Sequence, residues 1–384
     1  MKTDLHILVI PSWFPSETSP ISGIFVKQQV HALVDKGLRV GVVSPVLGKV
    51  TPQEQGGQTF TLLQGNVSNP LPFLPGSTGI FWIRKGMQLF QDYLKKHGTP
   101  DLIHAHSALY GGALASRIKE KYKIPYVLTE HSSYISRRDI NKWKLRWVKS
   151  AFHDADLNLA VSEYMKHSIL ENYGPGHGQW RVVPNLVDER YFRQQLPALE
   201  QEPFIFLNIG NLIEVKAQDV LLKAFAICYG KLGAKIKLRI VGEGELEGDL
   251  KKLALQLGIE DALEWIPDVS AETIPSLIAK SHLVVSSSST ETFGMTLAES
   301  LAVGRPVVST DSGGPRDIVS KTVGKLVPKD DPGLLSNALI EMVKHYSDYA
   351  AHDLRQYAEG RYHQDIIINR LHEIYKDIVG IQIN

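Results

Sequence analysis

The sequence predicts an α/β protein made of two doubly wound domains, each with a parallel sheet covered by helices. The chain has 384 residues, which is too long for one ordinary domain and suits two. Each half opens with a β-branched run, a glycine-containing loop and a helical pattern, at residues 5–37 and at residues 204–225. Strands that alternate with helices are typical of parallel sheets. We therefore expect residues 1–188 and 204–360 to fold as separate domains.

The composition is ordinary for a globular protein that builds sizeable cores, with 43% hydrophobic and 22% charged residues. Cys228 is the one cysteine, which excludes an intrachain disulfide and a cysteine-based metal site and favours a cytoplasmic location. Residues 5–10 form a short apolar run that stops at Pro11, so we do not expect a signal peptide. No apolar run approaches the ~18 residues that a membrane-spanning helix needs.

Charge is distributed unevenly along the chain. Residues 1–185 contain 21 Lys+Arg and 13 Asp+Glu, a net charge of +8, whereas residues 186–384 contain 21 and 28, a net charge of −7. A basic half beside an acidic half indicates that one domain meets an anionic surface, and a chance distribution is the alternative.

The first domain starts with a β-α-β unit. Strands are expected at 5–10 and 39–44, with a helix between them that Gly37 ends. The loop before this helix contains Gly23, where a missing side chain lets a ligand approach backbone N–H groups. Residues 50–80 are rich in Gly, Pro and Asn, and we expect irregular loops there with at most a short edge strand.

Histidines follow the next two expected strands. The run from Asp101 ends in His104 and His106, which we interpret as a strand end facing a ligand crevice, with a metal pair as the alternative. The apolar run from Tyr126 ends at His131, which can donate a hydrogen bond to a substrate hydroxyl or phosphate.

Residues 137–149 interleave basic and aromatic side chains on an expected helix. Trp143 and Trp147 are spaced i, i+4 and are surrounded by Lys142, Lys144, Arg146 and Lys149. Two interpretations fit this composition: a helix that lies on an anionic membrane surface, or a Trp pair in the core beneath a solvated basic face. No recognised nucleic-acid-binding motif accompanies it, so no nucleic-acid partner is expected.

The second half repeats the strand, glycine loop and helix. After a strand at 204–209 come Gly210, Asn211 and Lys216, and Lys216 would place a cation where the sheet ends. Residues 189–203 are polar, with Pro197 and Pro203, and are predicted to be the linker. Farther along, Gly242-Glu243-Gly244 is a weak dinucleotide-binding hint that lacks the third glycine.

The most informative stretch has two carboxylates spaced by seven residues, Glu291 and Glu299. It follows a strand-like run at 283–286 and the serines up to Ser289, and it opens a helix near Gly294. A helix that starts there directs free backbone N–H groups towards the loop, which suits a phosphate. The alternative is an acidic residue that favours the helix dipole and a second one on a solvated face.

This stretch, together with Gly304-Arg305-Pro306-Val307-Val308 and Gly313-Gly314-Pro315, resembles the donor-site signature of the retaining nucleotide-sugar glycosyltransferases of family 4. The resemblance implies the GT-B fold, in which two Rossmann-like domains face a cleft. It also implies that the amphipathic helix within 361–384 packs back on the first domain. The implied enzyme is a hexosyltransferase-type glycosyltransferase (EC 2.4) that moves a sugar from a nucleotide-diphosphate sugar to a hydroxyl acceptor.

The same resemblance implies roles for individual residues. Glu291 would hold a hydroxyl of the transferred sugar, Glu299 the ribose, and His131 the donor sugar or phosphate. Lys216 and the helix start would stabilise the leaving diphosphate. The further donor-binding positions are Gly23, Gly210, Asn211, Val269, Phe293, Gly294, Met295 and Thr296.

The chain departs from the family pattern in three places. Asn211 stands where the family usually has arginine, Ser22-Gly23 supplies one glycine of a usual pair, and Asp268 replaces a usual glycine. Arg305 and Arg316 are candidates for the missing arginine charge. The scheme needs no cofactor and no divalent metal, and the chain has no D-x-D run.

The expected acceptor is a sugar, a lipid-linked molecule or a polysaccharide of the cell envelope, which suits a cytoplasmic enzyme peripheral at the inner face of the membrane. Two other classes remain open from the sequence. One is a sugar phosphorylase or epimerase of the same fold, and the other is a non-catalytic nucleotide-sugar-binding protein, which the loss of arginine at Asn211 favours.

Overall fold

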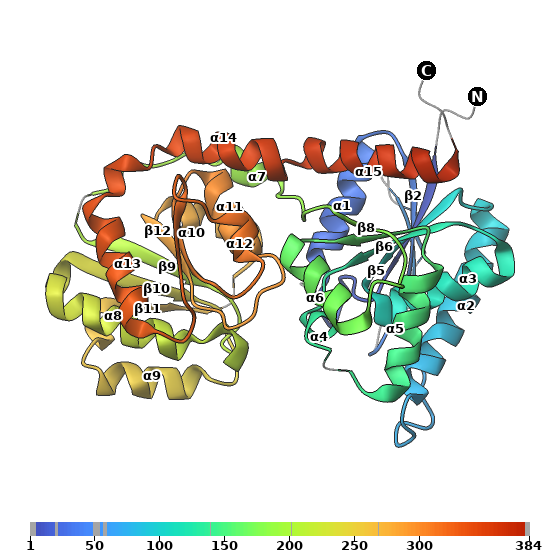
Figure 1. Ribbon diagram of the computed structural model, residues 1–384, viewed down its shortest axis with the longest axis horizontal. Coiled ribbons are helices and arrows are strands. Elements are labelled where there is room, and N and C mark those ends of the chain that lie inside the picture. Colours follow the sequence, from blue (N-terminus) through green and yellow to red (C-terminus); the bar gives the residue numbers. More distant parts are fainter. Residues whose placement is uncertain are drawn as a thin grey trace. The chain divides into compact units, whose positions relative to one another are not determined.

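A computed structural model describes most of the chain, and it divides into two compact units. The first unit runs to Leu186 and resumes at Gln364, and the second unit is Val187–His363. The described residues are 5–19, 22–48, 54–56, 60–138, 140–200, 202–267 and 269–380. Figure 1 shows that each unit has a central sheet with helices on both faces.

The sheet of the first unit has eight strands in the order β3-β4-β2-β1-β5-β6-β7-β8. All neighbouring pairs are parallel except β3 with β4. The central strands are almost wholly buried, because helices cover both faces. The strands are β1 (His6–Pro11), β2 (Arg39–Val46), β3 (Glu54–Gly56), β4 (Thr61–Asn66), β5 (Leu102–His106), β6 (Tyr126–Glu130), β7 (Leu157–Ala160) and β8 (Trp180–Val182).

Six long helices pack around this sheet. They are α1 (Ile24–Asp35), α2 (Ser77–His97), α3 (Ala113–Tyr122), α5 (Lys142–Asp154), α6 (Glu163–Tyr173) and α15 (Gln364–Val379). A four-residue helix, α4 (Ser133–Ser136), follows β6, and a π-helix, η1 (Ser107–Gly112), joins β5 to α3. Among the described residues no helix is both long and apolar enough to cross a bilayer.

The helix α2 was not foreseen in the sequence. Residues 50–80 were expected to form loops, yet α2 begins at Ser77 and runs for 21 residues, with Trp82 and Phe90 fully buried against the sheet. The prolines and glycines of residues 50–80 all lie before it, apart from Gly79. Within the helix, the missing side chains of Gly79 and Gly86 make room for Trp147 and Leu114. Tertiary packing therefore outweighs the weak helix propensity of glycine here.

The last helix, α15, belongs to the first unit. Ile367, Leu371 and Ile374 are buried in the same apolar cluster as Ile7 and Val9 of β1. Helix α15 (Gln364–Val379) lies within the range 361–384, and α14 (Ala351–Tyr362) ends in the second unit just before it begins.

The sheet of the second unit has six parallel strands in the order β11-β10-β9-β12-β13-β14. They are β9 (Phe204–Ile209), β10 (Ile236–Val241), β11 (Leu263–Ile266), β12 (Leu283–Ser286), β13 (Val307–Thr310) and β14 (Gly324–Val327). Strand β9 therefore lies between β10 on one side and β12 on the other, which makes the carboxyl ends of β9 and β12 a topological switch point. Ligands of open parallel sheets bind at such points.

Helices cover this second sheet, and the longer ones fill its core. They are α7 (Glu189–Phe192), α8 (Gln218–Leu232), α9 (Glu247–Gln256), α10 (Ile274–Ala279), α11 (Met295–Val303), α12 (Pro315–Ile318), α13 (Pro332–Lys344) and α14. Short 3₁₀ turns occur at Glu214–Lys216, Gly233–Lys235, Glu260–Ala262 and Tyr346–Asp348. The segment 189–203, predicted as a linker, differs from the expectation: it opens with α7, which packs against α11 because Tyr191 is buried.

Candidate active site

The switch point of the second unit is held together by side chains from β9 and β12. Asn208 is a buried polar residue in an otherwise apolar strand, and its Nδ2 donates to the Val285 carbonyl at 2.8 Å. The parallel ladder between the two strands joins Leu283 with Phe206 and Val284 with Leu207. The Asn208 bond continues the connection beyond those pairs, towards the loops that carry the candidate site.

The serines after β12 fasten its loop to the loop after β9. Ser287 Oγ donates to the Lys216 carbonyl at 2.8 Å, and the Ser289 N–H donates to the Val215 carbonyl at 2.9 Å. The next strand joins in, since Thr310 Oγ1 donates to the Ser288 carbonyl at 2.6 Å. The serine run therefore fixes the backbone on either side of Lys216.

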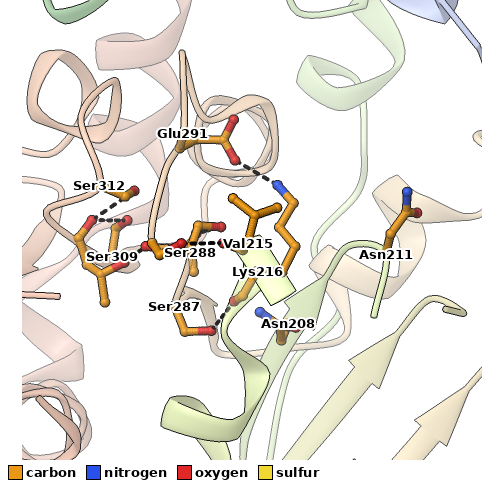
Figure 2. Close-up of polar contacts among 12 residues, drawn as sticks. Asn208, Asn211, Val215, Lys216, Ser287, Ser288, Glu291, Ser309 and Ser312 are labelled. Atoms are coloured by element: carbon orange, nitrogen blue, oxygen red, sulfur yellow. Dashed lines mark hydrogen bonds and ion pairs between the residues drawn. The ribbon is translucent and has the colours of Figure 1, made fainter. Parts of the chain in front are cut away.

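Lys216 and Glu291 form an ion pair across this switch point. Lys216 Nζ lies 2.7 Å from Glu291 Oε2, and the side chains keep 31% and 20% of their exposure. Figure 2 shows the two side chains pointing towards each other from separate loops, with the Asn211 side chain apart from them. The sequence predicted both residues as site residues, and the structure adds that they are direct partners.

The backbone of Glu291 is clamped by the loop after β13. Its N–H donates to the Ser312 carbonyl at 2.9 Å, and its carbonyl accepts from the Gly314 N–H at 2.8 Å. Gly314 has no room for a side chain, because a Cβ would lie 2.5 Å from the backbone of Thr292 and Phe293. The glycine loop thus sets the position of the Glu291 carboxylate.

Gly314→Ala is expected to lower the free energy of unfolding by about 1–3 kcal/mol, because the new methyl group must displace backbone atoms. Its φ of −51° is one that alanine adopts, so the effect is steric. Urea denaturation measures it. The control is Gly230→Ala in α8, where nothing lies within 4 Å of the added Cβ and stability should rise. Equal stability of Gly314→Ala and the parent chain would contradict the clamp.

Two helices begin at this edge of the sheet without side-chain caps. Helix α11 starts after Gly294 with a φ of 109°, and α8 starts after Ala217 with a φ of 47°. Asn141, Ser162, Asp188 and Asp331 each cap a helix through a side-chain oxygen, while α1, α2, α3, α9 and α14 also begin without one. Uncapped N-termini leave N–H donors and a partial positive charge for an anion. Met295 and Thr296 lie half-buried in the first turn of α11.

Other predicted donor-site residues have different surroundings. The Phe293 ring is buried and packs edge-on against Tyr362, with their ring centroids 5.7 Å apart, and its contact with a donor stays a prediction. Asn211 is exposed, and its carbonyl accepts from Gln218. Val269 is half-buried, two strands away from β9, while Asp268 lies outside the described residues.

The two arginines considered as replacements for the usual arginine at Asn211 each have other partners in the second unit. Arg305 is buried at the opposite end of β13, where it donates to the Tyr346 hydroxyl at 2.8 Å and the Ala279 carbonyl at 2.6 Å. Arg316 on α12 pairs with Asp311 at 2.5 Å.

The paired glycines after β10 have a structural role. A Cβ on Gly242 would lie 2.2 Å from the Gly210 carbonyl oxygen, and one on Gly244 would lie 2.3 Å from that of Leu212. The two loops also share backbone hydrogen bonds, since the Leu212 N–H donates to the Glu243 carbonyl at 2.9 Å. The spacing that hinted at dinucleotide binding lets these loops pack closely.

Glu299 lies on α11 beyond its first turn and hydrogen-bonds to the buried Tyr191 hydroxyl of α7. Burial raises the pKa of Glu299 to about 7, although the Tyr191 hydrogen bond and the nearby Arg190 lower it. Burial likewise raises the pKa of Tyr191, so its hydroxyl stays a donor. The sequence did not indicate Tyr191, because nothing local distinguishes it from a packing residue.

In the first unit, Gly23 and the three histidines gather at the carboxyl ends of β1, β5 and β6. A Cβ on Gly23 would lie 2.2 Å from the Trp13 carbonyl oxygen, so the missing side chain lets the backbone of Gly23 pack closely on that of Trp13. His106 Nδ1 lies 3.0 Å from His131 Nε2, and the rings stack. His104 is buried between Thr129 and Tyr375, which lie 2.7 and 2.6 Å from its ring nitrogens.

These histidines are neutral. Burial lowers the pKa of His104 and of His131 to about 3, and it lowers that of His106 well below its usual value. His104 was predicted to face a ligand crevice, but it does not, because both of its ring nitrogens form hydrogen bonds inside the first unit. Across the described part of the chain, no cluster of three or more His, Cys, Asp or Glu side chains is arranged to hold a metal ion.

Two family models match consecutive parts of the chain. The model described as Glycosyltransferase Family 4 matches residues 22–191, and the model described as Glycosyl transferases group 1 matches residues 189–361. The chain is a family 4 glycosyltransferase. Together the two matches cover residues 22–361, including the Glu291 and Glu299 stretch, and the prediction of a GT-B glycosyltransferase is confirmed.

Several known proteins are similar to this glycosyltransferase over nearly its whole length. An amylovoran biosynthesis glycosyltransferase of Erwinia amylovora is 25% identical, with 94% of this chain and 98% of the relative covered. Sucrose-phosphate synthase of Thermosynechococcus elongatus has the same fold at 18% identity, with a TM-score of 0.82 over 98% of this chain and 100% of that one. HepE of Anabaena, whose structure was solved with UDP, has a TM-score of 0.75 at 18% identity. The match covers 97% of this chain and 100% of HepE.

Tyr191→Phe is expected to shift the pH dependence of donor use by the glycosyltransferase. The lost hydroxyl no longer lowers the pKa of Glu299, so this carboxyl ionises at a higher pH than its present value of about 7. The KM for the donor, measured against pH, should therefore improve at higher pH than in the parent enzyme. An unchanged pH profile would show that Tyr191 only packs.

Proposed function

We propose that the switch point of the second unit binds the diphosphate of a nucleotide-diphosphate sugar. The observation that carries this proposal is the Lys216–Glu291 pair, which lies at the ends of β9 and β12 beside two helices that begin without side-chain caps. A cation and free backbone N–H groups together suit a phosphate. The diphosphate that leaves during glycosyl transfer gains negative charge, and such groups stabilise it most in the transition state.

The carboxylate of Glu291 forms an ion pair with the ammonium group of Lys216. Arrival of a diphosphate gives Lys216 a second anionic partner, so the carboxylate of Glu291 becomes available to a hydroxyl of the transferred sugar. The clamp of Glu291 by Ser312 and Gly314 keeps its backbone in place during this exchange. We assign Glu299 to the ribose hydroxyls, since it lies on α11, the helix that begins at this site.

His131 is assigned to the donor sugar or phosphate. Because burial holds its pKa at about 3, it acts as a neutral hydrogen-bonding group at physiological pH, and it adds no positive charge. The remaining donor-binding assignments, at Gly210, Asn211, Val269, Gly294, Met295 and Thr296, depend on backbone and loop contacts. The scheme assigns no role to a cofactor or a divalent metal.

Two features of the reaction are inferred from relatives. We infer retention of the anomeric configuration from family membership. We infer a hydroxyl acceptor in polysaccharide or glycolipid synthesis, a proposal that the amylovoran relative supports. Structures of HepE with UDP and with UDP-glucose make uridine-based donors the first to test.

The single, buried cysteine, Cys228, suits an enzyme that works in the cytoplasm.

The test is a panel of nucleotide sugars incubated with the enzyme, with and without saccharide and lipid-linked acceptors. Release of nucleoside diphosphate that depends on Lys216 and proceeds in the presence of EDTA is the expected result. Proton NMR of the product should show the anomeric configuration of the donor. An inverted product would overturn retention. Failure to release nucleoside diphosphate with any donor–acceptor pair would overturn the transferase scheme.

A further inference from the structure

The first unit exposes a group of apolar side chains around the starts of α2 and α5. We call this surface the α2–α5 face and define it by Leu71, Phe73, Leu74, Ile80, Trp143, Lys142 and Arg146. Phe73 keeps 74% of its exposure and Trp143 keeps 60%. Single exposed apolar residues are ordinary on protein surfaces, whereas a contiguous group rimmed by polar residues marks an interaction site.

The loop that carries Leu71, Phe73 and Leu74 is tied to the helix that follows it. Asn69 Nδ2 donates to Ser77 Oγ at 3.0 Å, and Asn69 Oδ1 accepts from the Leu71 N–H at 3.0 Å. Backbone hydrogen bonds join Leu74 to Leu71 and Ser77 to Leu74. Prolines at positions 70, 72 and 75 restrict the chain further. The apolar side chains are thus held outward by local structure.

Trp143 and Trp147 have different environments. The Trp147 ring of α5 packs on Gly79 of α2, where an added Cβ would lie 2.0 Å from it, so the two helices meet at this contact. Trp147 is half-buried, whereas Trp143, one turn earlier, faces outward. The two tryptophans therefore fit different interpretations. Trp147 packs within the first unit, whereas the exposed Trp143 is open to a partner.

A groove of about 510 Å³ lies within the face. It is lined by Pro75, Gly76, Ile80, Trp143, Trp147, Lys142 and Arg146. Its lining is therefore apolar with two cations and no carboxylate. The adjoining groove, which shares Ile80 and Trp147, adds Arg84, Arg117 and Lys121 and one acid, Glu120. An occupant must accordingly offer apolar surface and negative charge together.

We propose that the α2–α5 face docks on a bilayer that contains anionic phospholipids, with Phe73, Leu74, Ile80 and Trp143 in the headgroup and upper acyl region. An anionic bilayer supplies both kinds of surface that the face needs, and aromatic side chains anchor at this depth. The basic excess of the first half, +8 over residues 1–185, attracts the same surface. The proposal is independent of the donor chemistry, because none of these residues is assigned to it.

The experiment is co-sedimentation of the full chain with vesicles of phosphatidylcholine alone and of phosphatidylcholine mixed with phosphatidylglycerol. Binding should occur with the mixed vesicles and fall when salt shortens the Debye length from ~8 to ~3 Å. Phe73→Ser with Trp143→Ala should abolish detectable binding. Lys142→Gln with Arg146→Gln should lower the partition coefficient about thirtyfold, which corresponds to about 2 kcal/mol.

Matched controls lie on α9 of the second unit. Leu255 keeps 65% of its exposure, and Lys251 and Lys252 are surface cations, so Leu255→Ser and Lys251→Gln with Lys252→Gln should leave vesicle binding unchanged. Nucleoside diphosphate release by the variants, assayed with a water-soluble acceptor, confirms that they fold. Equal binding to both kinds of vesicle, no binding to either, or binding that survives both pairs of substitutions on the face would overturn the proposal.

Discussion

Replacing Lys216 with alanine is expected to lower turnover by about a hundred- to a thousandfold, the usual loss when one group that stabilises transition-state charge is removed. Its ammonium group is held at the switch point by the 2.7 Å contact with Glu291 and by the hydrogen bonds of Ser287 and Ser289 to its loop. The charge on the leaving diphosphate is greatest in the transition state, so kcat should fall more than donor affinity.

The effect on folding should be small by comparison. The Lys216–Glu291 pair is partly exposed, and such pairs contribute about 1 kcal/mol or less. Steady-state kinetics and thermal melting of the same samples separate the two effects. Lys223→Ala is the matched control, since Lys223 makes a 2.9 Å pair with Asp219 on α8. Normal turnover with a lowered Tm would show that Lys216 only supports the fold.

Replacing Glu299 with alanine is expected to weaken donor binding by about 1–3 kcal/mol, the contribution of a hydrogen bond to a charged group. The carboxylate accepts ribose hydroxyls better than the neutral acid does. Because the pKa of Glu299 is raised to about 7, donor affinity of the parent enzyme should increase as the pH rises through that value. Titration calorimetry with the donor identified by the panel measures both effects.

Glu299→Gln distinguishes binding from folding. The folded-state pKa lies above the usual value of 4.5, so the neutral form of Glu299 is the one that the fold favours. The stability associated with it is fully present below about pH 4.5 and is lost as the pH rises through about 7. Glutamine should keep that stability at high pH and remove the pH dependence of donor binding. An identical affinity in all three proteins would place Glu299 outside the donor site.

Much of the fold was predictable because it depends on local patterns. The β-branched runs at 5–10 and 204–209 are buried strands, and the helix after Gly294 begins where the sequence indicated. Glu291 and Glu299 were recognised from their spacing within one loop and helix. Helix α2 was missed because the Pro- and Gly-rich residues before Ser77 dominate that stretch, while its packing partners lie elsewhere in the chain.

The sequence by itself determined two doubly wound sheets, the strand ends that carry polar residues, and the family to which the enzyme belongs. Tertiary structure alone decided which of those residues meet. Lys216 and Glu291 are 75 positions apart and become partners only because β12 inserts beside β9. Tyr191 reaches Glu299 only because α7 packs on α11. Sequence patterns report neighbours along one helix or strand, whereas burial, and with it the raised pKa of Glu299 and the neutral histidines, depends on what the whole chain packs around each group.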